Sequence, residues 1–112
     1  MTWPIAFALT QLLEMPVYWF GTRASKLSVG KRLAAGFGAS ALTHPILWFV
    51  LYPTLIGLIG YWPFFVVGEA LVVIVEALYL GAFGVKRPWL VALAANTFSA
   101  TVGLILTPLL VG

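Results

Sequence analysis

The amino-acid sequence predicts an all-α integral membrane protein, a bundle of four transmembrane helices. Of the 112 residues, 62% are hydrophobic and only 8% are charged, whereas about 25% of the residues in a soluble domain are charged. Charged and turn-forming residues divide the chain into four apolar segments, each close to the ~20 residues that cross a bilayer. A soluble globular domain and a disordered chain are therefore excluded, and the length leaves room for one transmembrane domain over residues 1–112.

The four predicted spans follow one another with short connections. They are residues 3–21, 33–52, 64–83 and 89–111. A basic stretch from Arg23 to Arg32 ends the first span, and the stretch from Gly84 to Pro88 closes the third. Between the second and third spans, Pro53 and the Gly57–Pro63 stretch predict a chain reversal without charge. No internal repeat is evident in the sequence.

The positions of the basic residues predict how the bundle is oriented. All six Lys and Arg lie in the first and third connections, and basic loops stay in the cytoplasm. We therefore expect loops one and three inside and both termini outside, in the cytoplasmic membrane of a bacterium or archaeon. Aromatic residues mark the two interfaces: Trp3, Tyr52, Tyr61 and Trp62 at the outer one, and Tyr18, Trp19, Tyr79 and Trp89 at the inner one. A second interpretation of the basic cluster is a patch for lipid headgroups or a partner.

Ionisable residues inside the predicted spans are the strongest functional signal. Every acidic residue, Glu14, Glu69 and Glu76, lies within a span, and so does the only histidine, His44. No Lys or Arg lies at those depths to neutralise them. Because an ionisable side chain in the bilayer costs a few kcal/mol, such residues are candidates for function. We therefore interpret these four as a site that binds a cation or a proton.

Helical spacing predicts that polar side chains gather around the acids. Glu14, Glu76 and Asn96 lie about seven residues from the inner ends of their spans, hence at a common depth. His44 and Glu69 lie at a second depth, nearer the outside. The supporting polar residues are Thr10, Gln11, Ser40, Asn96 and Ser99. In a four-helix bundle these faces would converge as two stacked polar layers.

Three ionised carboxylates in hydrocarbon without a fixed cation would be prohibitive. The acids are therefore expected to hold protons or to bind another cation: sodium, a divalent metal or an organic cation. His44 is expected to pair with Glu69 as an imidazolium or to offer one ring nitrogen to a metal. No cofactor is predicted with certainty; a divalent metal on His44, Glu69 and Glu76 is a candidate, and the absence of cysteine excludes thiolate metal sites.

The first hypothesis for function is cation binding or movement. In size, four-span layout and a membrane glutamate at Glu14, the chain resembles the small multidrug resistance transporters, and it departs from them in the acids of the third span and in His44. A second hypothesis is an accessory subunit of a larger membrane complex, and a third is an intramembrane metal-dependent or Glu/His enzyme. Buried polar groups also join helices without further function.

The expected partners follow from the same features. They are the lipid bilayer and either further copies of the chain or other membrane subunits, because small residues on the second and fourth spans permit close helix approach. Nucleic acid is not expected, since the net charge of +3 has a topological explanation.

Overall fold

A computed structural model describes the backbone of residues 2–111 and the side chains of residues 2–106. Every secondary-structure element in this part is helical. The elements are α1 (Trp3–Gly21), α2 (Val29–Ile46), the π-helical turn η1 (Leu47–Leu51), α3 (Tyr52–Ile59), α4 (Tyr61–Phe83) and α5 (Pro88–Val111). Because α2, η1 and α3 form one continuous helix over Val29–Ile59, the chain makes four rods.

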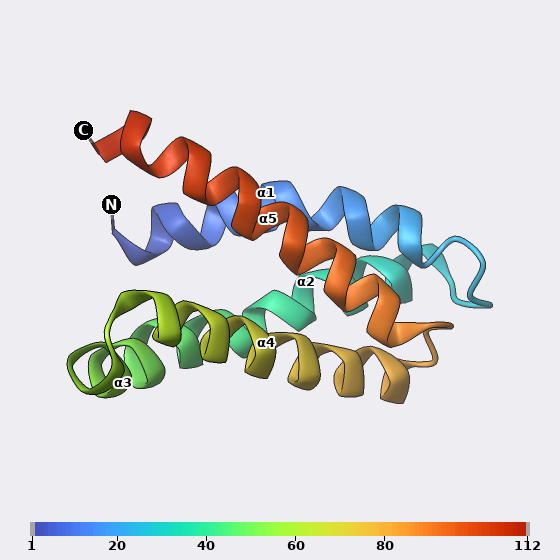
Figure 1. Cartoon of the computed structure of the whole chain (residues 1–112). Coiled ribbons are helices and arrows are strands. Elements are labelled where there is room, and N and C mark those ends of the chain that lie inside the picture. Colours follow the sequence, from blue (N-terminus) through green and yellow to red (C-terminus); the bar gives the residue numbers. More distant parts are fainter. Residues whose placement is uncertain (1, 112) are drawn as a thin grey trace.

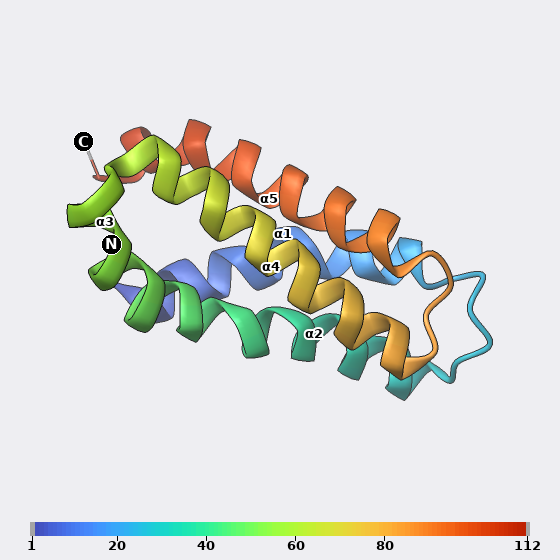
Figure 2. The ribbon, with the colours of Figure 1, turned by 60° about the horizontal axis from the view of Figure 1, so that its bottom comes forward.

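The four rods pack as a ring. α1 and α4 lie on opposite corners, and each contacts both α2 and α5. The α1–α2 and α4–α5 connections lie at one end of the bundle, whereas α3, the start of α1 and the end of α5 lie at the other (Figure 1 and Figure 2). The bundle is 43 Å long, which matches the ~40–45 Å of a bilayer with its headgroups.

The prediction of an all-helical fold is confirmed, and three of its helices are long and apolar enough to cross a membrane. Within the described residues these are Val29–Ile59, Tyr61–Phe83 and Pro88–Leu106. α1 is not among these three helices, and its 19 residues include Gln11 and Glu14. The status of α1 as a fourth span remains a prediction.

The second helix extends beyond the predicted span of residues 33–52 at both ends. The helix begins at Val29, where the Ser28 hydroxyl accepts a hydrogen bond from the Lys31 amide at 3.2 Å. Lys31 therefore lies in the first helical turn and not in the loop. The helix also passes through Pro53 and ends at Ile59, where Gly60 reverses the chain with a φ of 82°. Glycine adopts that backbone conformation without strain.

A π-helical turn lets the second rod continue past Pro53. In η1 the Tyr52 amide donates to the Leu47 carbonyl, five residues back, so the turn holds one more residue than an α-helical turn. Pro53 is the second residue of α3, and it has no N–H to donate to the preceding turn. Such turns are frequent at functional sites, and this one begins three residues after His44.

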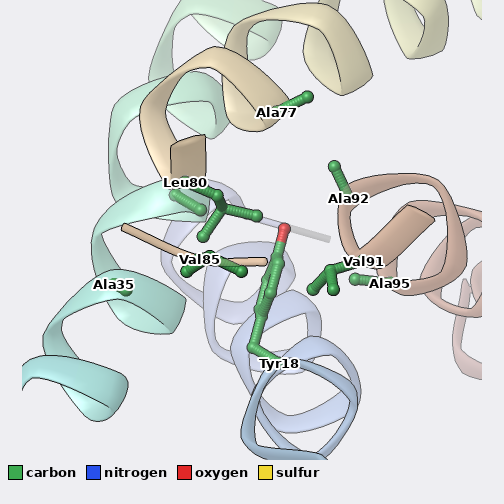
Figure 3. Close-up of a cluster of buried hydrophobic side chains, with 9 residues drawn as sticks. Tyr18, Ala35, Ala77, Leu80, Val85, Val91, Ala92 and Ala95 are labelled. Atoms are coloured by element: carbon green, nitrogen blue, oxygen red, sulfur yellow. The ribbon is translucent and has the colours of Figure 1, made fainter. Parts of the chain in front are cut away.

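Small residues let the rods approach closely at the basic end. Ala35 and Ala39 on α2 and Ala92 and Ala95 on α5 are fully buried, and they surround the fully buried Tyr18. Figure 3 shows the Tyr18 ring among Leu80, Val85 and Val91, with its hydroxyl pointing between the helices that carry Ala77 and Ala92. The aromatic ring fills space that these short side chains leave open, so Tyr18 belongs to the bundle core and is not one of the outward-facing aromatic residues.

Replacing Gly36 by alanine tests the close contact of α1 and α2. A Cβ at this position would lie 2.9 Å from the Tyr18 Cβ and 3.2 Å from the Met15 sulfur. We expect Gly36→Ala to lower the free energy of unfolding in detergent by about 1–3 kcal/mol. Gly57→Ala is the control, since a Cβ there meets nothing within 4 Å. Equal thermal stability of the two variants would contradict this packing.

Candidate functional site

Glu14 lies in the bundle core and is joined to two other helices. Its carboxyl group is 2% exposed. Ser40 on α2 donates to Glu14 Oε1 at 2.5 Å, and Ser99 on α5 donates to Oε2. Each carboxyl oxygen thus receives one hydroxyl, and the side chain links α1 to both of its neighbours.

Glu76 is the corresponding acid on α4, and it is 1% exposed. Oε1 accepts from the Tyr18 hydroxyl and, at 2.8 Å, from the Asn96 amide. Oε2 accepts from the Thr43 hydroxyl at 2.5 Å. The carboxyl group of Glu76 therefore has partners on all three other rods, α1, α2 and α5.

The two acids use the same pattern of partners. On α2, Ser40 donates to Glu14, and Thr43, three residues later in the chain, donates to Glu76. On α5, Asn96 donates to Glu76, and Ser99, again three residues later, donates to Glu14. Residues three apart share one face of a helix. These four hydrogen bonds therefore keep the same form when α1 is exchanged with α4 and α2 with α5, although the sequence contains no repeat. The bond from Tyr18 to Glu76 is the exception, because Glu14 has no counterpart of it.

A small cavity lies beside the two carboxyl groups. Its volume is about 100 Å³, which is room for a few water molecules or a small ion. Two of the three acids line it, Glu14 and Glu69, together with His44. The other polar residues around it are Thr10, Ser40, Thr43, Asn96 and Ser99. Glu76 adjoins this cavity through Thr43 and Asn96.

His44 is held by α1 and not by Glu69. The Trp3 indole N–H donates to His44 Nδ1 at 3.0 Å, so Nδ1 is an acceptor and carries no proton. His44 Nε2 lies 3.2 Å from the Thr10 hydroxyl, to which it can donate as the protonated nitrogen of a neutral imidazole. The expected imidazolium pair of His44 with Glu69 is therefore not formed.

Glu69 differs from the other two acids because it is only half-buried. Among the described residues it has no hydrogen-bond partner. It lines the inner cavity and also a groove of about 470 Å³ on the outside of α4 and α5. Asn96 and Ala100 line both spaces as well. Glu69 thus stands between the polar core and the outer surface of the bundle.

Two other expectations for the site differ from the structure. Within the described part, no three His, Asp or Glu side chains lie close enough together to hold a metal ion, so His44, Glu69 and Glu76 do not form the ligand set proposed for them. Gln11 also turns away from the cavity: its amide donates to the Phe37 carbonyl at 3.1 Å, and it lines a separate apolar groove between α1 and α2.

Three residues of the network were not identified from the sequence as parts of the site: Tyr18, Thr43 and Trp3. Tyr18 follows Glu14 by four residues and Thr43 follows Ser40 by three, so helical spacing gives a signal for both. Trp3 has no such signal, because its contact with His44 spans 41 positions of the chain.

The network can hold either protonation state of each acid. A hydroxyl group has one proton to donate, and the Thr43 hydroxyl lies 3.1 Å from the Ala39 carbonyl as well as beside Glu76 Oε2. When Glu76 is ionised, Thr43 donates to the carboxylate. When Glu76 is protonated, its O–H donates to Thr43, which turns its own proton to Ala39. Ser99 stands in the same way between Glu14 and the Asn96 carbonyl.

Replacing Tyr18 by phenylalanine tests the contribution of the network to stability. The change removes one donor from Glu76 and leaves the ring in place, so we expect the free energy of unfolding to fall by about 1 kcal/mol. Tyr79→Phe is the control, because the Tyr79 hydroxyl makes only a 3.4 Å contact with the Ala34 carbonyl, outside the core. The network is not stabilising if both variants melt at the temperature of the unmodified protein.

Comparison with known proteins gives this chain no family. No protein-family model matches it, and neither does any curated protein or any solved structure. The resemblance to the small multidrug resistance transporters thus rests on size, layout and Glu14 alone. Because a helical bundle hosts many functions, the fold alone does not indicate a function. The site is more informative, with two buried, hydrogen-bonded carboxyl groups beside a small polar cavity.

Proposed function

We propose that the protein is a four-span membrane protein that binds a small cation in its core, a proton before any other, and moves it across the membrane. Glu14 and Glu76 are the binding groups, and Glu69 is the third acid, at the lateral edge of the cavity. His44, held as a neutral imidazole, is a polar relay on the cavity wall. The reversible hydroxyl partners of Glu14 and Glu76 are the observation that carries the proposal.

Charge supports a bound cation over a purely structural role. All six basic residues of the chain lie between residues 23 and 32 or at 86 and 87, away from the buried acids. A carboxylate without a cation in a low-dielectric core is costly, so at least one of the two acids has reason to take up a proton or another positive ion. Hydrogen bonds between helices alone do not require acids, since amides and hydroxyls supply them.

The size of the cavity supports a small cation. About 100 Å³ accommodates a hydronium ion, a bare metal ion or a few water molecules, whereas an organic cation needs several times this volume. Water molecules in that space would connect Glu14 and Glu69 by hydrogen bonds, which is how protons move between side chains too far apart to touch. A proton therefore suits the cavity better than the metal or organic cation also considered.

We infer the orientation of the bundle in the membrane from its two ends. The basic connections at one end favour the cytoplasmic side, so the termini and the α3–α4 turn belong outside. Along this axis His44 and Glu69 lie on the outer side of Glu14 and Glu76. The proposed route for a proton runs from His44 and Glu69 through the paired acids to the cytoplasmic end, or the reverse.

Proton flux into liposomes tests this function. The full chain is reconstituted with a pH dye inside, and a potassium gradient with valinomycin supplies the driving potential. We expect flux well above that of empty liposomes. Glu14→Gln, Glu69→Gln and Glu76→Gln should each keep the helical circular-dichroism spectrum and lower the flux at least about tenfold, because a glutamine cannot carry the proton.

The control for these variants is Thr54→Val. It removes an exposed hydroxyl on α3 that donates to the Val50 carbonyl at 2.6 Å, outside the core, and it should leave the flux unchanged. Full flux in all three glutamine variants would exclude the acids as carriers. Wild-type liposomes that pass neither protons nor sodium faster than empty ones would exclude transport altogether.

A second candidate function, an accessory subunit of a larger assembly, is favoured by Glu69. This acid is half-buried and has no hydrogen-bond partner in the described part of the chain. The groove beside it carries the short side chains of Ala70, Ala100 and Thr101, which let another helix approach closely. A polar or basic side chain of a second copy or of another subunit would then meet Glu69.

Cross-linking in the membrane tests the assembly. Ala70→Cys and Ala100→Cys place thiols on the groove in a chain that has no cysteine of its own. If the groove is an interface between copies, oxidation should give disulfide-linked dimers. Leu12→Cys, exposed on the opposite groove of α1, serves as the matched control. Equal dimer yields from all three positions would count against a specific interface at Glu69.

A further inference from the structure

The end of the bundle that carries the basic residues has a hollow between α1 and α5. Its volume is about 520 Å³. Arg23 lines it just beyond the end of α1, and Lys86 and Arg87 line it from the α4–α5 connection. Farther along the two helices its wall is apolar, with Val17 on α1 and Leu90 on α5. The hollow therefore combines a cationic rim with an apolar wall.

The backbone of this rim is fixed by contacts between the two connections. The Lys86 amide donates to the buried Ser25 hydroxyl at 2.9 Å, which ties the α4–α5 connection to the α1–α2 connection; Figure 2 shows the two side by side. Arg87 has a φ of 54°, and among the described residues it is the only one other than glycine with a positive φ. That conformation costs about 1–2 kcal/mol for a residue with a Cβ, so the fold accepts a conformational cost to place an arginine at this position.

The cations of the rim have no acidic counterpart in the protein. No Asp or Glu occurs in residues 22–32 or 84–91. The side chains of Lys86 and Arg87 have no hydrogen-bond partner within the described part of the chain. Arg23 donates to the Phe20 carbonyl at 2.8 Å and lies over the Phe20 ring, but neither contact supplies a negative charge. Arg32, outside the hollow, donates to the Thr22 hydroxyl at 3.0 Å and stacks on Trp19. Three neighbouring cations repel one another, so an anion at the rim would lower the energy of this end.

We propose that the hollow binds an anionic phospholipid. The phosphate lies between Arg23, Lys86 and Arg87, and one acyl chain lies along the apolar wall formed by α1 and α5. A free phosphate would leave that wall uncovered, and a zwitterionic lipid would bring its own cation to the rim. Trp19 and Trp89 are exposed at the same end, as is typical at the level of the headgroups, and basic pockets between helices on the cytoplasmic side hold anionic headgroups.

Lipid retention tests this site, independently of any transport. The full chain is reconstituted in nanodiscs with equal amounts of phosphatidylglycerol and phosphatidylcholine that carry the same acyl chains. It is then extracted in detergent, and the bound lipids are counted by native mass spectrometry. We expect at least one retained phosphatidylglycerol per chain. The double variant Lys86→Gln/Arg87→Asn should bind it about thirtyfold more weakly, given a contribution of about 1 kcal/mol from each basic residue at a membrane surface. Asparagine tolerates the φ of residue 87, so this variant should fold.

The matched control is Lys26→Gln/Lys31→Gln, which removes the same charge from exposed side chains of the same end that do not line the hollow. It should retain phosphatidylglycerol as the unmodified protein does. Equal loss of phosphatidylglycerol in both double variants would mean that only the net charge matters, and this would overturn the proposal. Equal retention of phosphatidylglycerol and phosphatidylcholine by the unmodified protein would overturn it as well. Displacement of the lipid by millimolar inorganic phosphate would show a simple anion site and overturn it too.

Discussion

Two carboxyl groups in the core of a small helical bundle, with no basic side chain beside them, constrain the rest of the molecule. A buried acid is tolerated only when its oxygens are hydrogen-bonded. In this protein each of the two acids receives one partner from α2 and one from α5. Because α1 and α4 occupy opposite corners and each carries one of these two acids, the same bonds that satisfy the acids also join all four helices. Site and fold thus depend on one network.

Helix packing and the network support each other. Short donors such as Ser40 and Thr43 reach the carboxyl groups only if the rods are close together. The buried alanines on α2 and α5 permit that approach, and Gly36 lets α2 pass close to the Cβ of Tyr18. Tyr18 then spans the remaining distance and donates to Glu76 on the opposite rod. A larger residue at any of these small positions would separate donor from acceptor, so the choice of small residues is part of the chemistry of the site.

Sequence reasoning found the helical class and the polar cluster because both depend on local signals. Apolar segment length marks the helices, and Glu14, Ser40, Asn96 and Ser99 follow from helical spacing. It failed where a contact between distant parts of the chain determines the structure. Trp3 donates a hydrogen bond to His44 across 41 positions, and this bond takes the place of the expected pairing of His44 with Glu69. It also gave no sign that the second helix continues past Pro53, because the extra residue of the π turn at Leu47–Leu51 leaves no mark in the hydrophobic pattern.

We propose that Glu14 and Glu76 bind a proton reversibly in the bundle core. Infrared difference spectroscopy of the lipid-reconstituted protein tests this binding most directly, because the C=O stretch of a protonated carboxyl group is separate from other protein bands. We expect a carboxyl band that appears and disappears as pH is titrated, that loses intensity when a competing cation binds, and that is diminished in Glu14→Gln and Glu76→Gln. A band that changes with neither pH nor added cations would mean that the acids are fixed structural groups and that they do not bind a proton reversibly.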